Sequence, residues 1–201
     1  MINIALLNDK LLQAVLTIVR SFGWLMLWIA VLFFAVAVWT RFNPIFINTS
    51  ESLPMGIYIK SIEPIEKGAY VAFCPPDSEV FAMARARGFI EVNNDINNGN
   101  CDSENGLMLK QVVAVKGDLL SIDREGVTVN EQKIPNTSQF ATDSFNQTIP
   151  SLKLVNRRLL ESEVLLLANF HPRSFDGRYF GLTDSSMIKV RVKPWIIVFN
   201  E

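Results

Sequence analysis

The sequence has almost no net charge and very few histidines and cysteines. Its 201 residues include 19 basic and 20 acidic side chains, which gives a formal net charge of −1. This balance provides no basic field that would attract nucleic acid, so no nucleic-acid partner is expected. The chain has a single histidine, His171, and two cysteines, Cys74 and Cys101. These residues are too few and too scattered for a zinc site, and we expect no metal and no cofactor.

Two familiar hydrolase signatures are also missing. The sequence contains neither Gly-x-Ser-x-Gly nor His-Glu-x-x-His, which argues against an α/β-hydrolase elbow and against a zinc protease. A Ser/His/Asp triad that uses His171 stays open as an alternative. However, His171 lies beside Pro172 in a predicted loop, which is a poor place for a fixed base.

Residues 21–40 form a long apolar run without a single charge. A helix of this length just crosses the roughly 30 Å hydrocarbon core of a bilayer. We therefore predict a transmembrane helix over residues 21–40, preceded by a cytoplasmic or interfacial segment (1–20) and followed by an exported domain (41–201). Basic residues before the helix favour a cytoplasmic N-terminus. The alternative is a cleaved secretory signal, because Ala35, Val36 and Ala37 form a small-x-small pattern.

The remainder of the chain consists of short apolar stretches separated by Pro, Gly, Asn and Asp, which predicts a mainly β domain with a barrel-like sheet. One helix is expected at residues 79–87, with Asp77 or Ser78 as its N-cap and Gly88 at its end. The predicted strands are residues 56–62, 69–73, 107–115, 119–122, 127–129, 164–167 and 188–192.

Two polar segments and the two cysteines complete this picture. Residues 93–105 are predicted to be a surface loop, and residues 135–150 an insertion between strands in which no chemistry is evident. An exported domain lies in an oxidising compartment, where a disulfide between Cys74 and Cys101 would persist. Two unpaired thiols are the alternative.

Residues 48–58 read NTSESLPMGIY and contain the first candidate for catalysis, Ser52. Asn48, Ser50 and Ser52 fall on every second position, so an extended chain would place them on one side. Pro54 restricts the backbone just after Ser52. Taken alone, this pattern indicates only a strand that leads into a turn.

Lys110 is the second candidate, because it lies within the apolar stretch LMLKQVVAV of residues 107–115. Burial of a lysine removes hydration from its ammonium group and lowers its pKa. A neutral amine could then accept a proton from a serine hydroxyl. The alternative is a lysine at the edge of a sheet that points into water.

Residues 174–181, SFDGRYFG, contain a carboxylate and a guanidinium two positions apart. On an extended chain Asp176 and Arg178 would lie on the same side and could form an ion pair. A solvated turn with opposite charges is the alternative.

Together these segments resemble the signal peptidase I superfamily, and most closely its conjugal-transfer branch, the TraF-type serine peptidases. NTSESLPMGIY is similar to the branch motif Asn-x-Thr-x-Ser-x-Pro-x-Gly, with Ser52 at the nucleophile position and Ser50 in place of threonine. LKQVVAVKGD is similar to the box in which the general-base lysine, here Lys110, precedes a Gly-Asp pair.

Two further boxes follow in the family's order. GVTVNEQKIP resembles a Gly-Val-x-Val-Asn hairpin, although Glu131 stands where glycine is usual. SFDGRYFG is similar to the terminal box Ser-x-Asp-Ser-Arg-Tyr-Phe-Gly, with glycine in place of its second serine. The resemblance implies that Ser174 helps to orient the lysine and that Asp176 and Arg178 hold the site together.

The resemblance implies a β-barrel-type catalytic domain of the signal peptidase and LexA kind. It also implies a serine endopeptidase, anchored in the bacterial inner membrane by a single helix, with its catalytic domain on the periplasmic side. Ser52 would be the nucleophile and Lys110 the base, and the oxyanion hole would be formed by Ser52 and Ser50. The expected partners are the membrane and exported precursor proteins such as a propilin, which would be cleaved. Transfer of the acyl group to water and transfer to an amine, which gives a cyclic pilin, stay open as alternatives.

Two other functions stay open. The chain could be a non-catalytic periplasmic assembly component of a conjugation or secretion apparatus, in which case it would have no need to retain both Ser52 and Lys110. A LexA-like self-cleaving regulator uses the same Ser/Lys chemistry. The predicted anchor and the lack of a DNA-binding segment argue against this regulator.

Overall fold

The computed structural model describes residues 4–42, 44–90, 101 and 105–198. The chain divides into two compact units, Met1–Pro44 and Ile45–Glu201. We describe each unit by itself.

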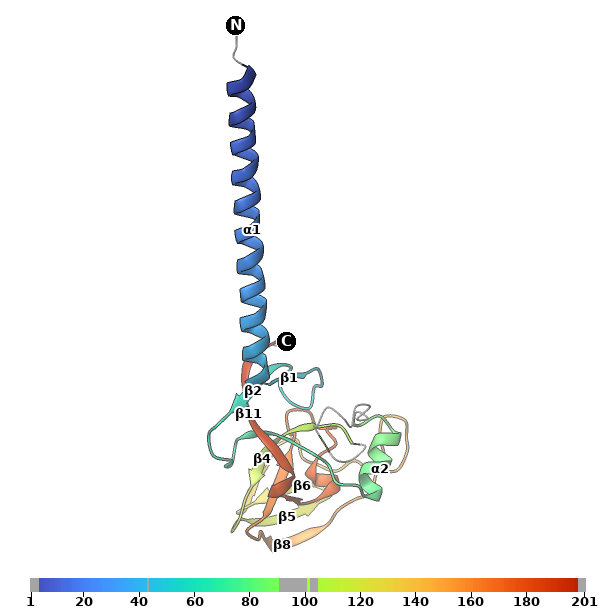
Figure 1. The fold of residues 1–201 in the computed structure, drawn as a ribbon. Helices are drawn as coiled ribbons and strands as arrows, with labels where there is room; N and C mark the ends of the chain where they lie inside the picture. The colour runs from blue at the N-terminus through green and yellow to red at the C-terminus, as the bar shows by residue number, and fades with distance from the viewer. Residues whose placement is uncertain (1–3, 43, 91–100, 102–104, 199–201) are drawn as a thin grey trace. The chain divides into compact units, whose positions relative to one another are not determined.

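The first unit is one long helix, α1, which spans Ile4–Phe42 (Figure 1). Its part Gln13–Phe42 is 30 residues long with a mean hydropathy of 2.3, so it is long and apolar enough to cross a membrane. The predicted span of residues 21–40 lies within it. The helix begins earlier than predicted because residues 4–20 are mostly good helix formers and contain no proline.

The second unit is built from antiparallel sheets, as Figure 1 shows, and the prediction of a mainly β, barrel-type domain is confirmed. A seven-stranded sheet has the order β1-β2-β11-β3-β4-β9-β10, and a four-stranded sheet the order β7-β6-β5-β8. The strands are β1 (Ile45–Asn48), β2 (Gly56–Ser61), β3 (Tyr70–Phe73), β4 (Met108–Ala114), β5 (Leu119–Asp123), β6 (Gly126–Val129), β7 (Gln132–Lys133), β8 (Leu154–Arg158), β9 (Glu163–Leu167), β10 (Thr183–Asp184) and β11 (Ile188–Ile197).

The hydrophobic core has two parts that meet at strand β9. Leu166 packs into one cluster with Val71, Phe73 and other residues. Leu165 and Leu167 pack into a second cluster around the four-stranded sheet. Because successive strand residues point to opposite faces, β9 forms a common wall between the two clusters.

Each of the seven predicted strands is present, but four short strands were not predicted. The missed strands are β1, β7, β8 and β10, which have between two and five residues each. β8 reads LVNRR and has no clear apolar alternation. The predicted helix is α2, Glu79–Ala86, and Ser78 is its N-cap. A short helix α3, Gly177–Phe180, and a 3-10 turn, Ser185–Met187, complete the unit.

The two cysteines form a disulfide in the structure, with Cα atoms 5.5 Å apart. Most of the surface loop predicted at residues 93–105 lies outside the described residues. Asn105, at its end, is fully buried, so the prediction of surface exposure is wrong at this position. Its Oδ1 accepts a hydrogen bond from Arg85 at 2.7 Å, and its Nδ2 donates to the carbonyl of Pro76 at 3.2 Å.

Candidate active site

Ser52, the predicted nucleophile, lies in a turn between β1 and β2 and is half-buried. The prediction that Asn48, Ser50 and Ser52 share one side of an extended chain is therefore wrong beyond Asn48. The cause is the Asn48 side chain, whose Nδ2 donates to the carbonyls of Ser50 (3.0 Å), Leu53 (3.0 Å) and Pro54 (3.2 Å). These bonds fold the backbone around the amide group.

The other end of the same amide fixes Ser50. Asn48 Oδ1 accepts hydrogen bonds from the Ser50 backbone N–H at 3.3 Å and from the Ser50 hydroxyl at 2.9 Å. Asn48 thus satisfies five bonds within a single turn and is itself buried. This role of Asn48 was not predicted from the sequence, although asparagine side chains commonly bond the backbone two residues further on.

Lys110 lies on β4, which is hydrogen-bonded to β3 on one side and to β9 on the other. The alternative of an edge lysine that points into water is wrong. Lys110 shares the buried face of the strand with Met108 and Val112, and only 5% of its surface is exposed. Among the described residues, its ammonium group forms no hydrogen bond.

This environment lowers the pKa of Lys110 to about 8. The main cause is burial, which disfavours the charged form of the amine. The carboxylate of Asp176 raises the pKa and the guanidinium of Arg178 lowers it, so these two charges act in opposite directions on Lys110.

Ser52 and Lys110 line the same hollow, which we call the first hollow and which has a volume of about 180 Å³. Asn48 and Ser50 line it as well. The fold therefore brings together the predicted nucleophile, the predicted base and the predicted second oxyanion donor, although they come from segments about 60 residues apart.

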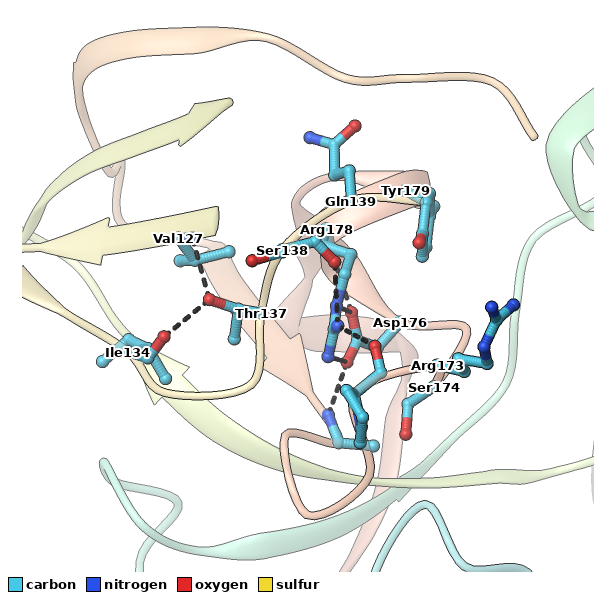
Figure 2. Close-up of polar contacts among 12 residues, drawn as sticks. Val127, Ile134, Thr137, Ser138, Gln139, Arg173, Ser174, Asp176, Arg178 and Tyr179 are labelled. Carbon is cyan, nitrogen blue, oxygen red and sulfur yellow. Dashed lines mark hydrogen bonds and ion pairs between the residues drawn. The ribbon is translucent and has the colours of Figure 1, made fainter. Parts of the chain in front are cut away.

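Asp176 and Arg178 form a fully buried ion pair, as Figure 2 shows. Arg178 Nε donates to Asp176 Oδ1 at 2.8 Å and Nη2 donates to Oδ2 at 2.9 Å, a two-pronged geometry that strengthens the contact. Arg178 Nη1 also donates to the carbonyl of Pro172 at 2.7 Å, and Asp176 Oδ2 accepts from the Ala168 N–H at 2.8 Å. The predicted pairing is present, and the predicted solvated turn is not.

The pair arises in a different way from the one predicted. Asp176 is the N-cap of α3 and accepts a hydrogen bond from the Arg178 N–H at 3.1 Å, so the chain is not extended here. A Cβ atom at Gly177 would lie 2.7 Å from the carbonyl oxygen of Leu166. The close packing of α3 against β9 therefore requires glycine where the family box has serine.

Ser174 is buried, and its hydroxyl donates to the carbonyl of His171 at 2.9 Å. Among the described residues, Ser174 and Lys110 share no hydrogen bond. Ser174 lies together with Ser52 in the lining of another hollow of about 290 Å³, the second hollow. The predicted role of Ser174 in orienting Lys110 stays a prediction.

The insertion at residues 135–150 forms one wall of the second hollow. Phe140, Thr142 and Ile149 line it opposite the turn of Ser52. This role in the lining was not predicted, and the expectation that the insertion offers no chemistry stays a prediction. Phe140 and Ile149, two of the three large apolar residues within an otherwise polar segment, were the signal that could have indicated this role.

The amino-acid sequence matches a known protein family over most of its length. The family model described as "Signal peptidase, peptidase S26" matches residues 18–196. The chain belongs to this signal peptidase family. It is 40% identical over 148 residues to the plasmid transfer protein TraF of Escherichia coli, which covers 74% of this chain and 80% of that protein. It is also 28% identical to the conjugal transfer protein TraF of Agrobacterium tumefaciens (strain 15955), over 72% of this chain and 78% of that one.

Within the signal peptidase family the chain is of the TraF type. A crystal structure of a signal peptidase I from Enterococcus faecalis V583 is 14% identical and aligns with a TM-score of 0.36, covering 66% of this chain and all of that chain. The residues matched by the signal peptidase model include the turn of Ser52, strand β4 with Lys110, and the Asp176–Arg178 pair.

The buried ion pair predicts how substitution of Arg178 changes the stability of this protein. Arg178→Met leaves the Asp176 carboxylate buried without its partner, which should cost about 3–5 kcal/mol of unfolding free energy. Arg157→Met is a matched control, because Arg157 contacts Glu163 at 2.7 Å but is 38% exposed. It should cost at most about 1 kcal/mol. Thermal unfolding of the full chain in detergent measures both changes. An equal decrease in unfolding free energy for the two variants would contradict a larger structural role for the buried pair.

Proposed function

We propose that this protein is a membrane-anchored serine endopeptidase of the signal peptidase type, with Ser52 as nucleophile and Lys110 as general base. One observation carries the proposal: a buried lysine whose pKa is lowered to about 8 lines the same hollow as a serine in a constrained turn. At pH 7 roughly a tenth of such amines are neutral, compared with well under a thousandth at the ordinary pKa of lysine.

The chemistry follows from these two groups. The neutral amine of Lys110 accepts the hydroxyl proton as Ser52 Oγ attacks the peptide carbonyl, and the resulting ammonium donates that proton to the leaving amine. An acyl-enzyme on Ser52 remains. Water then attacks the ester carbonyl, Lys110 accepts a proton from it, and the resulting ammonium donates this proton to Ser52 Oγ as the ester C–O bond breaks, which restores the serine hydroxyl and the neutral amine. Lysine thus acts at both stages, in the way that histidine does in a classical triad.

The oxyanion would be stabilised by the Ser52 backbone N–H and the Ser50 hydroxyl. In the structure the Ser50 hydroxyl donates to Asn48 Oδ1 at 2.9 Å. A hydroxyl has one hydrogen, so it must turn from Asn48 towards the substrate when the oxyanion forms. The bonds from Asn48 Nδ2 to three carbonyls hold the turn while this hydrogen moves.

The apolar helix and the relatives suggest the substrate class. The helix would anchor the enzyme in the bacterial inner membrane, with the second unit on the periplasmic side and close to exported precursors. Because the relatives are named as plasmid and conjugal transfer proteins, we propose a propilin of a conjugation system as substrate. The acyl group could pass to water or to an amine of the same precursor. Mass spectrometry separates these outcomes, since a cyclic product is one water lighter.

The dyad is tested by two substitutions. Ser52→Ala and Lys110→Met should each abolish processing of the pilin precursor in cells that lack another such peptidase, as measured by mass spectrometry of the product. Lys110→Met should not lower the melting temperature at pH 7. At this pH, below the folded-state pKa of about 8, Lys110 is mostly charged, and its buried ammonium lowers the free energy of unfolding by the largest amount. The controls are Ser151→Ala and Lys60→Met, which change exposed residues of the same types. Unchanged processing in the two dyad variants would instead favour a non-catalytic assembly component.

The pKa of the base predicts the pH dependence of the reaction. Since the neutral amine is the reactive form, kcat/KM should rise with pH and level off above an apparent pKa of about 8. The pH profile of precursor cleavage measures this. A rate that is flat between pH 6 and 9 would argue against Lys110 as the base.

The proposed oxyanion donor is tested by two changes at Ser50. Ser50→Ala removes the donor and should lower kcat by about 100-fold or more, which corresponds to about 2.7–4 kcal/mol, with KM changed only a few-fold. Ser50→Thr restores the hydroxyl and should recover most of the rate. If the alanine variant keeps a comparable kcat, Ser50 is not a donor to the oxyanion.

A further inference from the structure

We propose that the second hollow is a substrate subsite that takes a large apolar or aromatic side chain next to the scissile bond. This inference rests on the proposed function, because it takes Ser52 as the reactive residue. Ser52 lines both hollows. A peptide whose carbonyl carbon reaches Ser52 Oγ would therefore lie at the border of both hollows, where a residue next to the scissile bond can place its side chain in the second.

The volume of the second hollow fits a large side chain. It measures about 290 Å³, against about 180 Å³ for the first hollow. A dry cavity of about 150 Å³ already accepts benzene in another protein. By volume, the second hollow can therefore hold a phenylalanine or leucine side chain.

The walls of the second hollow are mainly apolar and aromatic. Phe175 lies between two other rings of the lining, with its centroid 5.6 Å from that of Phe89 and 6.0 Å from that of Tyr179. Phe140 and Ile149 of the insertion contribute apolar surface from the opposite segment. Burial of an apolar side chain among these groups is favourable, and ring-on-ring contact adds to it.

Each charged side chain in this lining already has an internal partner. Asp143 contacts Arg87 at 3.2 Å, and its Oδ1 accepts from the backbone N–H of Gln147 at 2.8 Å. The Arg173 guanidinium lies 4.5 Å from the centre of the Phe140 ring. At the rim, His171 and Glu51 lie 3.7 Å apart. These contacts already engage the charged groups of the lining, and the apolar walls favour an uncharged substrate side chain.

The wall contributed by the insertion is held in place from several sides. Thr142 and Thr148 form a β-bridge, and the Ile149 N–H donates to the carbonyl of Ala141 at 2.9 Å. Arg87, just after α2, donates to the carbonyl of Thr148 at 3.0 Å. The Phe140 N–H donates to the hydroxyl of Tyr179, on α3, at 2.9 Å. These bonds shape the hollow before any substrate binds, as expected of a specificity pocket.

Substitutions of opposite effect test the proposal. Thr142→Trp should fill the hollow, and Ile149→Ala should enlarge it. Gln147→Trp is the matched control, because Gln147 is an exposed residue of the same segment that lines neither hollow. The probe is a mixture of peptides from a digested proteome, and mass spectrometry of the cleaved peptides gives the preference at each position around the scissile bond.

For the wild-type enzyme and Gln147→Trp, one position beside the scissile bond should favour Phe or Leu over Ala by at least tenfold in cleavage efficiency. Thr142→Trp should reduce this preference to less than twofold at that position alone, and Ile149→Ala should shift it towards Trp. Identical profiles in all four proteins, or the same change in Gln147→Trp, would overturn the proposal.

A separate binding measurement distinguishes this proposal from the proposed function. Ser52→Ala and the double variant Ser52→Ala/Thr142→Trp are used to capture peptides from the same mixture without cleavage. Captured peptides should be enriched in large apolar residues for the first protein and not for the second. If the wild-type enzyme cleaves no peptide but this enrichment is seen, the proposed catalytic function fails, and the second hollow is a binding site for apolar side chains that lies beside no scissile bond. If cleavage occurs without any apolar preference, the subsite fails and the catalytic function stands.

Discussion

The ion pair between Asp176 and Arg178 joins the segments that surround the site. Asp176 accepts from the N–H of Ala168, directly after β9, and it caps α3. Arg178 donates to the carbonyls of Pro172, in the loop that leads to Ser174, and of Ser138, at the start of the insertion. A buried pair of this kind contributes little net stability compared with apolar residues of the same volume, but removal of one partner is costly. Its value here is that it fixes several chain segments in one arrangement.

The pair also sets part of the electrostatics of the site. The carboxylate of Asp176 raises the pKa of Lys110, and the guanidinium of Arg178 lowers it. Loss of Arg178 alone would leave the carboxylate to raise the pKa of Lys110 and favour the charged, unreactive amine. Loss of Asp176 alone would have the reverse effect. The same contact therefore couples the packing of α3 and the insertion to the proton affinity of a strand residue.

Much of the fold could be predicted from the sequence, because apolar strands and a charge-free helix leave clear patterns. The arrangement of the candidate active site was harder to predict from the sequence. Local physical chemistry did not distinguish Lys110 from an edge lysine, since the position of β4 between β3 and β9 depends on long-range pairing. The order of the family boxes indicated Ser52 and Lys110 instead. The turn built by Asn48 and the cap formed by Asp176 were missed, because an alternating pattern was read as extended chain where side chains bond the backbone. The wall formed by residues 140–149 is polar in sequence, and only tertiary packing turns Phe140 and Ile149 inward.

The position of Lys110 on a strand paired on both sides divides the site into a rigid part and an adaptable part. The backbone of Lys110, the proposed base, is hydrogen-bonded within a sheet between β3 and β9. The wall of the second hollow belongs to the insertion between β7 and β8, which lies outside the named strands. Related chains could therefore differ in this insertion while the strand that carries the proposed base keeps its pairing on both sides. Divergence of specificity among relatives should be concentrated in this segment and be nearly absent from β4.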